Sequence, residues 1–208
     1  MSILKTIKKN KIIPLGTLVN EDEVLSICNC LTEADIPLIE VTLRDKRVID
    51  AIPSFKKYSN IYLGIGTIRT TEQIDLAINA GASFAITPGF SPKISDYASS
   101  KGLLLIPGVQ TASEVMAASE AGHKVLKFFP AELSGGIDKL NAFKSVFPDI
   151  TFIPTGGITN KNIANYLNLG NVVAVGASSA MPESLIRSRS WDKITKNLLE
   201  IKTIIKTT

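Results

Sequence analysis

Val125-Leu126-Lys127-Phe128-Phe129-Pro130 is a short apolar run that stops at a proline and carries one lysine. A run of this kind predicts a buried strand. An ammonium in such a strand costs several kcal/mol of desolvation unless it is paired or gives up its proton. A lysine made neutral in this way is a nucleophile that forms Schiff bases with ketones. A lysine at a strand end that reaches water is the ordinary alternative, so the neighbouring segments have to decide between the two.

The same kind of run recurs along the whole chain. The expected strands span 12–18, 37–43, 62–67, 84–89, 103–108, 125–130, 151–157 and 172–178. Most are continuously apolar, which is typical of parallel strands covered on both faces. Helix-start signals stand at 70–73 and 111–114, and glycines that end helices stand at 81, 122 and 170. Eight such units over residues 1–208 predict an α/β fold with one domain, a (β/α)8 TIM barrel; a doubly wound open sheet is the alternative.

Composition and cysteine usage exclude several classes of function. The chain has 208 residues, 45% hydrophobic and 20% charged, with a formal net charge of +4 and no basic face with aromatic residues, so nucleic-acid binding is not expected. Pro14 and Gly16 interrupt the apolar run after the basic N-terminal segment, so we expect no signal peptide, no membrane span and a cytoplasmic location. Cys28 and Cys30 are one residue apart in an expected helix, and His123 is the only histidine. A metal site is therefore not expected.

Polar residues gather at the ends of the expected strands, where barrels build their active sites. The two-residue period of the second strand puts Glu40, Thr42 and Arg44 on one face. Because both faces of a barrel strand are covered, such a row must be paired internally or line a site, whereas in a half-exposed antiparallel sheet it would face water. The same period puts Lys127 and Phe129 on one face of the sixth strand.

The other strand ends carry hydroxyls, prolines and glycines. They are Thr67, Pro88, Thr155, Gly156, Gly157 and Ser178. The loops after the seventh and eighth strands of such barrels frequently bind phosphate, because glycines expose their N–H groups to the anion. The combination indicates a phosphorylated keto acid whose carboxylate is clamped by Arg44 and whose ketone condenses with Lys127. The resulting iminium is the electron sink that aldol cleavage needs.

Six segments in a fixed order are distinctive. They are Ile39–Arg44 (IEVTLR), Gly64–Thr67 (GIGT), Ala82–Gly89 (ASFAITPG), Leu105–Gln110 (LIPGVQ), Leu126–Glu132 (LKFFPAE) and Phe152–Ile158 (FIPTGGI). This set resembles the class I 2-keto-3-deoxy-6-phosphogluconate (KDPG) aldolases, which are also described as 4-hydroxy-2-oxoglutarate (KHG) aldolases. The resemblance covers nearly the whole chain, and the KFFPAE and PTGG stretches carry it most clearly.

The resemblance implies a role for each matching position. Lys127 is similar to the Schiff-base lysine, Glu40 to the general acid/base and Arg44 to the residue that meets the substrate carboxylate. The further counterparts are the pocket hydroxyls Thr67 and Thr155, the wall residues Pro88 and Phe129, and the phosphate-loop residues Gly156, Gly157 and Ser178. The family fold is a (β/α)8 barrel with an extra N-terminal helix, for which residues 2–10 are available. The family assembles as a homotrimer and needs no metal or organic cofactor.

The implied activity is reversible cleavage of KDPG to pyruvate and D-glyceraldehyde 3-phosphate, and of KHG to pyruvate and glyoxylate. Two departures bear on the substrate. Many members carry a basic residue near Gly16-Thr17-Leu18, and the loop at 176–179 has less glycine than in some relatives. A sister aldolase for the galactonate epimer or for an unphosphorylated 4-hydroxy-2-oxo acid is therefore an alternative. A phosphate-binding isomerase or epimerase, and a non-catalytic sugar-phosphate-binding module, are the alternatives from other classes.

Overall fold

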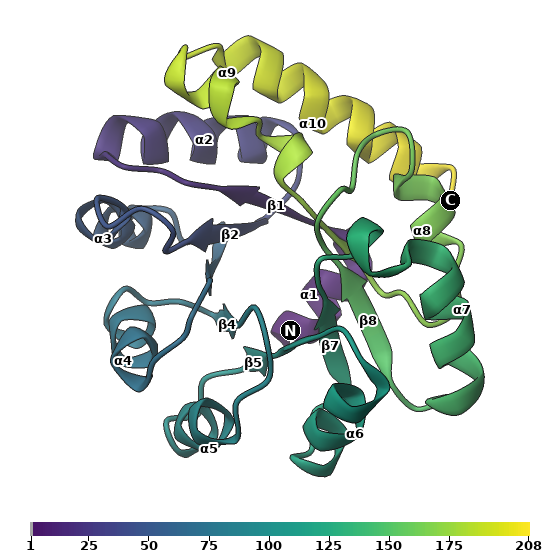
Figure 1. The fold of residues 1–208 in the computed structure, drawn as a ribbon. Helices are drawn as coiled ribbons and strands as arrows, with labels where there is room; N and C mark the ends of the chain where they lie inside the picture. The colour runs from purple at the N-terminus through teal and green to yellow at the C-terminus, as the bar shows by residue number, and fades with distance from the viewer. Residues whose placement is uncertain (1) are drawn as a thin grey trace.

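The computed structural model describes residues 2–208, in which helices surround a set of parallel strands (Figure 1). The strands are β1 (Ile12–Gly16), β2 (Leu38–Thr42), β3 (Tyr62–Gly66), β4 (Phe84–Ile86), β5 (Leu105–Ile106), β6 (Gly108–Val109), β7 (Val125–Phe128), β8 (Thr151–Pro154) and β9 (Val175–Ala177). The α-helices are α1 (Ile3–Asn10), α2 (Glu21–Glu33), α3 (Val48–Ala51), α4 (Thr71–Asn79), α5 (Pro92–Ser100), α6 (Ala112–Glu120), α7 (Gly136–Val146), α8 (Ile163–Leu167), α9 (Glu183–Arg187) and α10 (Trp191–Lys206). The 3₁₀ helices are η1 (Ile52–Lys57), η2 (Glu132–Ser134) and η3 (Ser178–Ala180).

Strand pairing within residues 2–208 is parallel throughout. One sheet has the order β5-β4-β3-β2-β1-β9, and the other has the order β6-β7-β8. Isolated parallel bridges join Phe152 to Val172 and Thr155 to Gly176, next to the ends of β8 and β9. The fold is therefore α/β with a curled parallel sheet, as the alternation of apolar runs and helical segments predicts.

Pro107 divides an expected strand into two. The sequence predicts one strand over 103–108, whereas the structure pairs β5 with β4 and, after Pro107, β6 with β7. The next N–H on the β4 side, that of Gly108, donates to the Thr87 side-chain hydroxyl at 3.3 Å and not to a β4 carbonyl, so the ladder with β4 ends there. The Pro107 carbonyl instead accepts a hydrogen bond from the Lys127 N–H at 2.8 Å. The chain thus changes its pairing partner at this residue and leads toward β7.

Other element ends follow the sequence signals with small shifts. The expected strands at 84–89 and 172–178 are shorter in the structure, since β4 ends at Ile86 and β9 starts at Val175. Helices α4 and α6 begin after Thr70 and Thr111, and each threonine takes part in a capping box. The early end of β4 leaves Thr87 and Pro88 in the loop that follows the strand.

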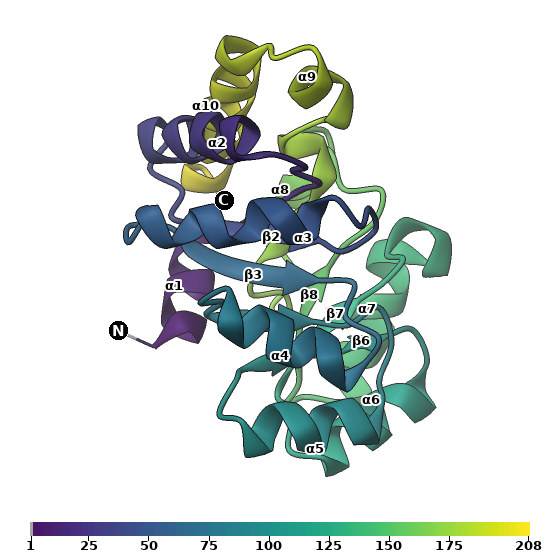
Figure 2. The same ribbon diagram turned by 90° about the vertical axis from the view of Figure 1, so that its left-hand side faces the viewer.

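Helix α1 confirms the N-terminal helix expected at residues 2–10. Its Ile7 is fully buried in an apolar cluster that includes Ile13, Phe84 and Ile153. Figure 2 shows α1 beside the end from which the strands start. Apolar side chains therefore close that end of the sheet, and polar groups concentrate at the opposite end. None of the helices in residues 2–208 has the length and apolar character required to cross a membrane.

Candidate active site

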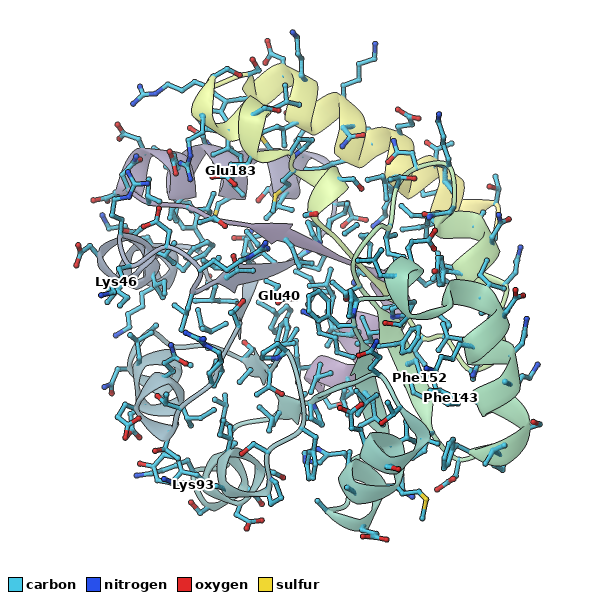
Figure 3. All side chains as sticks on the ribbon, in the orientation of Figure 1. Glu40, Lys46, Lys93, Phe143, Phe152 and Glu183 are labelled. Carbon is cyan, nitrogen blue, oxygen red and sulfur yellow. The ribbon has the colours of Figure 1, made fainter. Side chains whose placement is uncertain are left out.

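A cavity of about 220 Å³, which we call the inner cavity, lies at the end toward which the strands point. It is lined by Leu15, Glu40, Thr42, Arg44, Thr67, Pro88, Lys127, Phe129, Thr155, Gly156 and Ser178. Figure 3 shows Glu40 near the centre of the ring of helices. Every site residue expected from the sequence, except Gly157, therefore lies in the wall of one cavity.

Lys127 and Glu40 meet inside this cavity. Lys127 Nζ lies 3.2 Å from Glu40 Oε1, and the two residues are 6% and 1% exposed. The alternative in which Lys127 reaches water is therefore wrong. A Cβ atom at Gly66 would lie 2.0 Å from Glu40 Oε1, so the glycine makes room for the carboxylate. The aromatic ring of Phe129, with its centroid 5.2 Å from Nζ, covers the amine on another side.

Arg44 and two threonines form the adjacent wall. Thr42 Oγ1 lies 2.9 Å from Thr17 Oγ1 and accepts a hydrogen bond from Arg44 Nε at 3.4 Å. Glu40 and Thr42 line the inner cavity, in agreement with the two-residue period of β2, and Arg44, in the turn that follows the strand, lines it as well. Thr67 has a φ of 64°, a left-handed conformation that β-branched residues rarely adopt. Backbone strain is thus located in the wall of the cavity.

A second cavity of about 400 Å³, which we call the outer cavity, adjoins the first. It is lined by Leu15, Gly16, Thr17, Arg44, Gly157, Ile158, Thr159, Ser178, Ser179, Met181, Pro182 and Glu183. Gly157, the expected residue missing from the inner cavity, lies here. Gly156 and Gly157 have φ values of 98° and 80°, which glycine adopts without a steric penalty. Glycines, hydroxyl groups and one carboxylate dominate the wall, with Arg44 as its only cation among residues 2–208.

Arg187 lies beside the outer cavity and is not among the site residues that the sequence predicts. Its Nη2 donates a hydrogen bond to the Thr17 carbonyl at 2.8 Å, and its Nη1 pairs with Glu23 at 2.5 Å. Nη2 also contacts Glu183 at 3.4 Å. A guanidinium from α9 therefore reaches the end of the first strand, at Thr17, but two carboxylates share its charge. The only signal in the sequence is the Glu183–Arg187 spacing, which is common on helices.

The cysteines and the histidine line neither cavity. Burial raises the pKa of the Cys28 thiol to about 12. His123 Nε2 lies 2.7 Å from Ser95 Oγ, and burial lowers the pKa of the imidazole. In the described part of the chain, no group of three or more His, Cys, Asp or Glu side chains is arranged to hold a metal. The two cysteines and His123 therefore lie in the packed part of the fold, outside the candidate site.

The inner cavity contains the groups that imine chemistry requires. A primary amine and a carboxylate lie at a distance that allows proton transfer, and both are shielded from bulk water. Arg44 adds a guanidinium that can bind a carboxylate with two hydrogen bonds. The outer cavity, which shares Leu15, Arg44 and Ser178 with the inner one, adds glycines and hydroxyls to the same end of the fold.

Comparison with known proteins identifies the family. A family model for KDPG and KHG aldolases matches residues 3–197. The 2-dehydro-3-deoxy-phosphogluconate aldolase of Haemophilus influenzae is 35% identical over 205 residues, covering 98% of this chain and 97% of that protein. The KHG/KDPG aldolase of Escherichia coli is 34% identical over 196 residues, covering 94% and 91%. A crystal structure of KDPG aldolase from Legionella pneumophila, with pyruvate captured as a covalent carbinolamine, has a TM-score of 0.92 and 34% identity and covers 97% of this chain and 98% of that one. The chain belongs to the KDPG and KHG aldolase family.

Proposed function

We propose that the protein is a class I aldolase that reversibly cleaves 2-dehydro-3-deoxy-6-phosphogluconate to pyruvate and D-glyceraldehyde 3-phosphate. The observation that carries this proposal is the buried contact of 3.2 Å between Lys127 Nζ and Glu40 Oε1. The Legionella relative with its covalent carbinolamine supports it, since a carbinolamine is the adduct of an amine with a ketone. The E. coli relative, a KHG/KDPG aldolase, supports cleavage of 4-hydroxy-2-oxoglutarate to pyruvate and glyoxylate as a second activity.

Lys127 and Glu40 carry the chemical steps. Glu40 takes a proton from the Lys127 ammonium, and the free amine attacks C2 of the substrate to form the carbinolamine. Glu40 returns the proton to the carbinolamine hydroxyl, which leaves as water and gives the iminium. Glu40 then removes the proton of the 4-hydroxyl while the C3–C4 bond breaks and its electron pair moves to the iminium nitrogen. The aldehyde leaves; protonation of the enamine at C3 and hydrolysis release pyruvate and regenerate Lys127.

The remaining site residues hold the substrate. Arg44 binds the carboxylate next to the reacting ketone, because a guanidinium matches a carboxylate with two hydrogen bonds. The hydroxyls of Thr67 and Thr155 donate to substrate oxygens, and Pro88 and Phe129 form apolar walls. The phosphate binds at Gly156, Gly157 and Ser178, at the boundary with the outer cavity. The long axis of the substrate thus runs from the inner to the outer cavity.

The proposal includes the architecture that the family resemblance implies. Residues 1–208 form a single domain, a closed (β/α)8 barrel in which β5 and β6 count as one strand broken at Pro107. The bridge between Thr155 and Gly176 supports closure between β8 and β9. The functional assembly is a homotrimer, which size-exclusion chromatography with light scattering tests directly.

Trapping with borohydride tests the chemistry. The protein is incubated with pyruvate and sodium borohydride, and its intact mass and peptide map are measured. We expect one pyruvate-sized adduct on Lys127, because borohydride reduces the iminium to a stable amine. If folded protein gave no adduct, the proposal of an aldolase would be rejected, and an isomerase or a binding module would be favoured. Turnover of KDPG beside its galactonate epimer and unphosphorylated 4-hydroxy-2-oxo acids then identifies the substrate.

A further inference from the structure

The Thr155–Ile158 segment is held from behind at each of its carbonyl groups. The carbonyls of Thr155 and Gly156 accept hydrogen bonds from the N–H groups of residues 131 and 132, at 2.8 and 3.1 Å. The Gly157 carbonyl accepts from Asn162 Nδ2 at 3.0 Å, and the Ile158 carbonyl accepts from Ser179 Oγ at 2.8 Å. Four successive peptide groups therefore have fixed orientations.

The N–H groups on the other side of this segment are free. Those of Gly157 and Ile158 have no acceptor within residues 2–208, and both residues line the outer cavity. Ile158 is only 3% exposed. Buried N–H groups are nearly always paired, so the Ile158 N–H is placed for an oxygen atom of a ligand, and Gly157, which is exposed, has its unpaired N–H next to it.

Glu132 is the side chain that packs against this segment. A Cβ atom at Gly157 would lie 2.4 Å from Glu132 Cγ and 2.7 Å from its Cβ, so the aliphatic part of Glu132 lies directly on the glycine. Its Oε1 accepts a hydrogen bond from the hydroxyl of Tyr166 in α8. Tyr166 is fully buried, and its phenol needs this partner, because a buried hydroxyl without one is costly. Residue 132 is exposed, so the hydrogen bond to Tyr166 is what restrains its carboxylate.

We infer that Tyr166 and Glu132 are positioning residues for the phosphate-bearing end of the substrate. Their hydrogen bond keeps Glu132 against Gly157 and so orients the N–H groups of Gly157 and Ile158 toward the outer cavity. Neither side chain lines either cavity, so both act through the backbone. The inference rests on the proposed aldolase function.

The positioning role of Tyr166 and Glu132 can be tested with two acceptor aldehydes that differ only in the phosphate group. The rate of aldol addition of pyruvate to D-glyceraldehyde 3-phosphate and to D-glyceraldehyde is measured for the wild type and for Tyr166→Phe. Loss of a hydrogen bond to a carboxylate weakens the anchor, so we expect kcat/KM for the phosphorylated acceptor to fall about tenfold, mainly through KM. For D-glyceraldehyde we expect a change of less than about twofold, because its reaction does not use the oriented N–H groups. The ratio of the two values does not depend on the fraction of folded enzyme.

Three further variants make the result specific. Tyr97→Phe removes a similar tyrosine–carboxylate bond, to Asp75 at 2.9 and 3.0 Å between α5 and α4, and should leave the ratio unchanged. Glu132→Gln keeps both the aliphatic part and an acceptor oxygen, so the ratio of kcat/KM for the two aldehydes should stay close to the wild-type value. Glu132→Ala removes both and should lower the ratio as Tyr166→Phe does. Since residue 132 is exposed, this variant also serves if Tyr166→Phe does not fold.

The outcomes separate the inference from the function. Equal losses with both aldehydes, or no loss with either, would overturn the positioning role. Failure of the aldolase function would be visible earlier, as a wild-type enzyme that adds pyruvate to neither aldehyde and gives no borohydride adduct.

Discussion

The inner and outer cavities are built in different ways. In the inner cavity, the side chains proposed to do the chemistry, Lys127 and Glu40, lie on strands and are 6% and 1% exposed. In the outer cavity, much of the wall is loop backbone around Gly157 and Ile158. A change of side chain should therefore remove function in the inner cavity outright. In the outer cavity, the proposed function depends on residues that hold the backbone from behind, so changes there should be graded.

Replacing the lysine is the largest expected effect. Lys127→Ala removes the only amine in the inner cavity, so we expect no measurable turnover of any substrate and no borohydride adduct. Lys124→Ala is the matched control, because Lys124 pairs with Asp149 at 2.5 Å and is well exposed. It should keep full activity. Residual cleavage by Lys127→Ala with an adduct on another lysine would show that the catalytic amine lies outside the inner cavity.

Glu40→Gln should rank second. The amide keeps the shape and leaves the buried lysine without a carboxylate that can exchange protons, so kcat should fall by roughly 10²–10⁴-fold for phosphorylated and unphosphorylated substrates alike. Steady-state kinetics with both substrate types measures this, and thermal unfolding checks that the fold is kept. If only the phosphorylated substrate were affected, Glu40 would act in binding the phosphate and not in the chemical step.

These two variants concern residues that the sequence places correctly. Period-two alternation along β2 and β7 predicts the orientation of Glu40, Thr42 and Lys127, and its extension past the end of β2 predicts that of Arg44; all four line the inner cavity. A two-residue period is a local property of a strand, so it can be seen without the tertiary structure. The family motifs point to the same positions.

Residues behind the outer cavity have no such local signal. Arg187 meets the carbonyl of Thr17 across 170 positions of the chain, and Tyr166 meets Glu132 across 34. Their contacts depend on how α8 and α9 pack, which spacing along one element does not reveal. The break in the expected strand at 103–108 could not be predicted for the same reason. Pro107 is visible in the sequence, but the change of pairing partner from β4 to β7 depends on the arrangement of the whole sheet.

Gly157→Ala should have an intermediate effect, restricted to the outer cavity. Its φ of 80° is unfavourable for alanine, and the new Cβ would lie 2.4 Å from Glu132 Cγ, so the segment must shift. We expect kcat/KM for KDPG to fall about tenfold or more, with a much smaller change for unphosphorylated 4-hydroxy-2-oxoglutarate. Gly102→Ala is the control for strain alone, because its φ is 70° and nothing lies within 4 Å of the added Cβ. Equal changes in Gly157→Ala for both substrates would argue against a separate role for the outer cavity.

Thr17→Val tests the boundary between the cavities and should have the smallest effect. Thr17 lines the outer cavity, but its hydroxyl lies 2.9 Å from Thr42 Oγ1, which lines the inner cavity and contacts Arg44. Valine keeps the shape and removes this hydrogen bond, which is worth about 1 kcal/mol, so KM should rise roughly fivefold. Because Arg44 is the proposed binding group for the carboxylate that all the substrates share, the rise should be the same with and without phosphate. Thr203→Val, which removes a hydroxyl bond to Leu199 on α10, is the control and should leave KM unchanged. A rise confined to phosphorylated substrates would mean that Thr17 acts in the outer cavity after all, and that the two regions meet at Arg44 and not at the threonine pair.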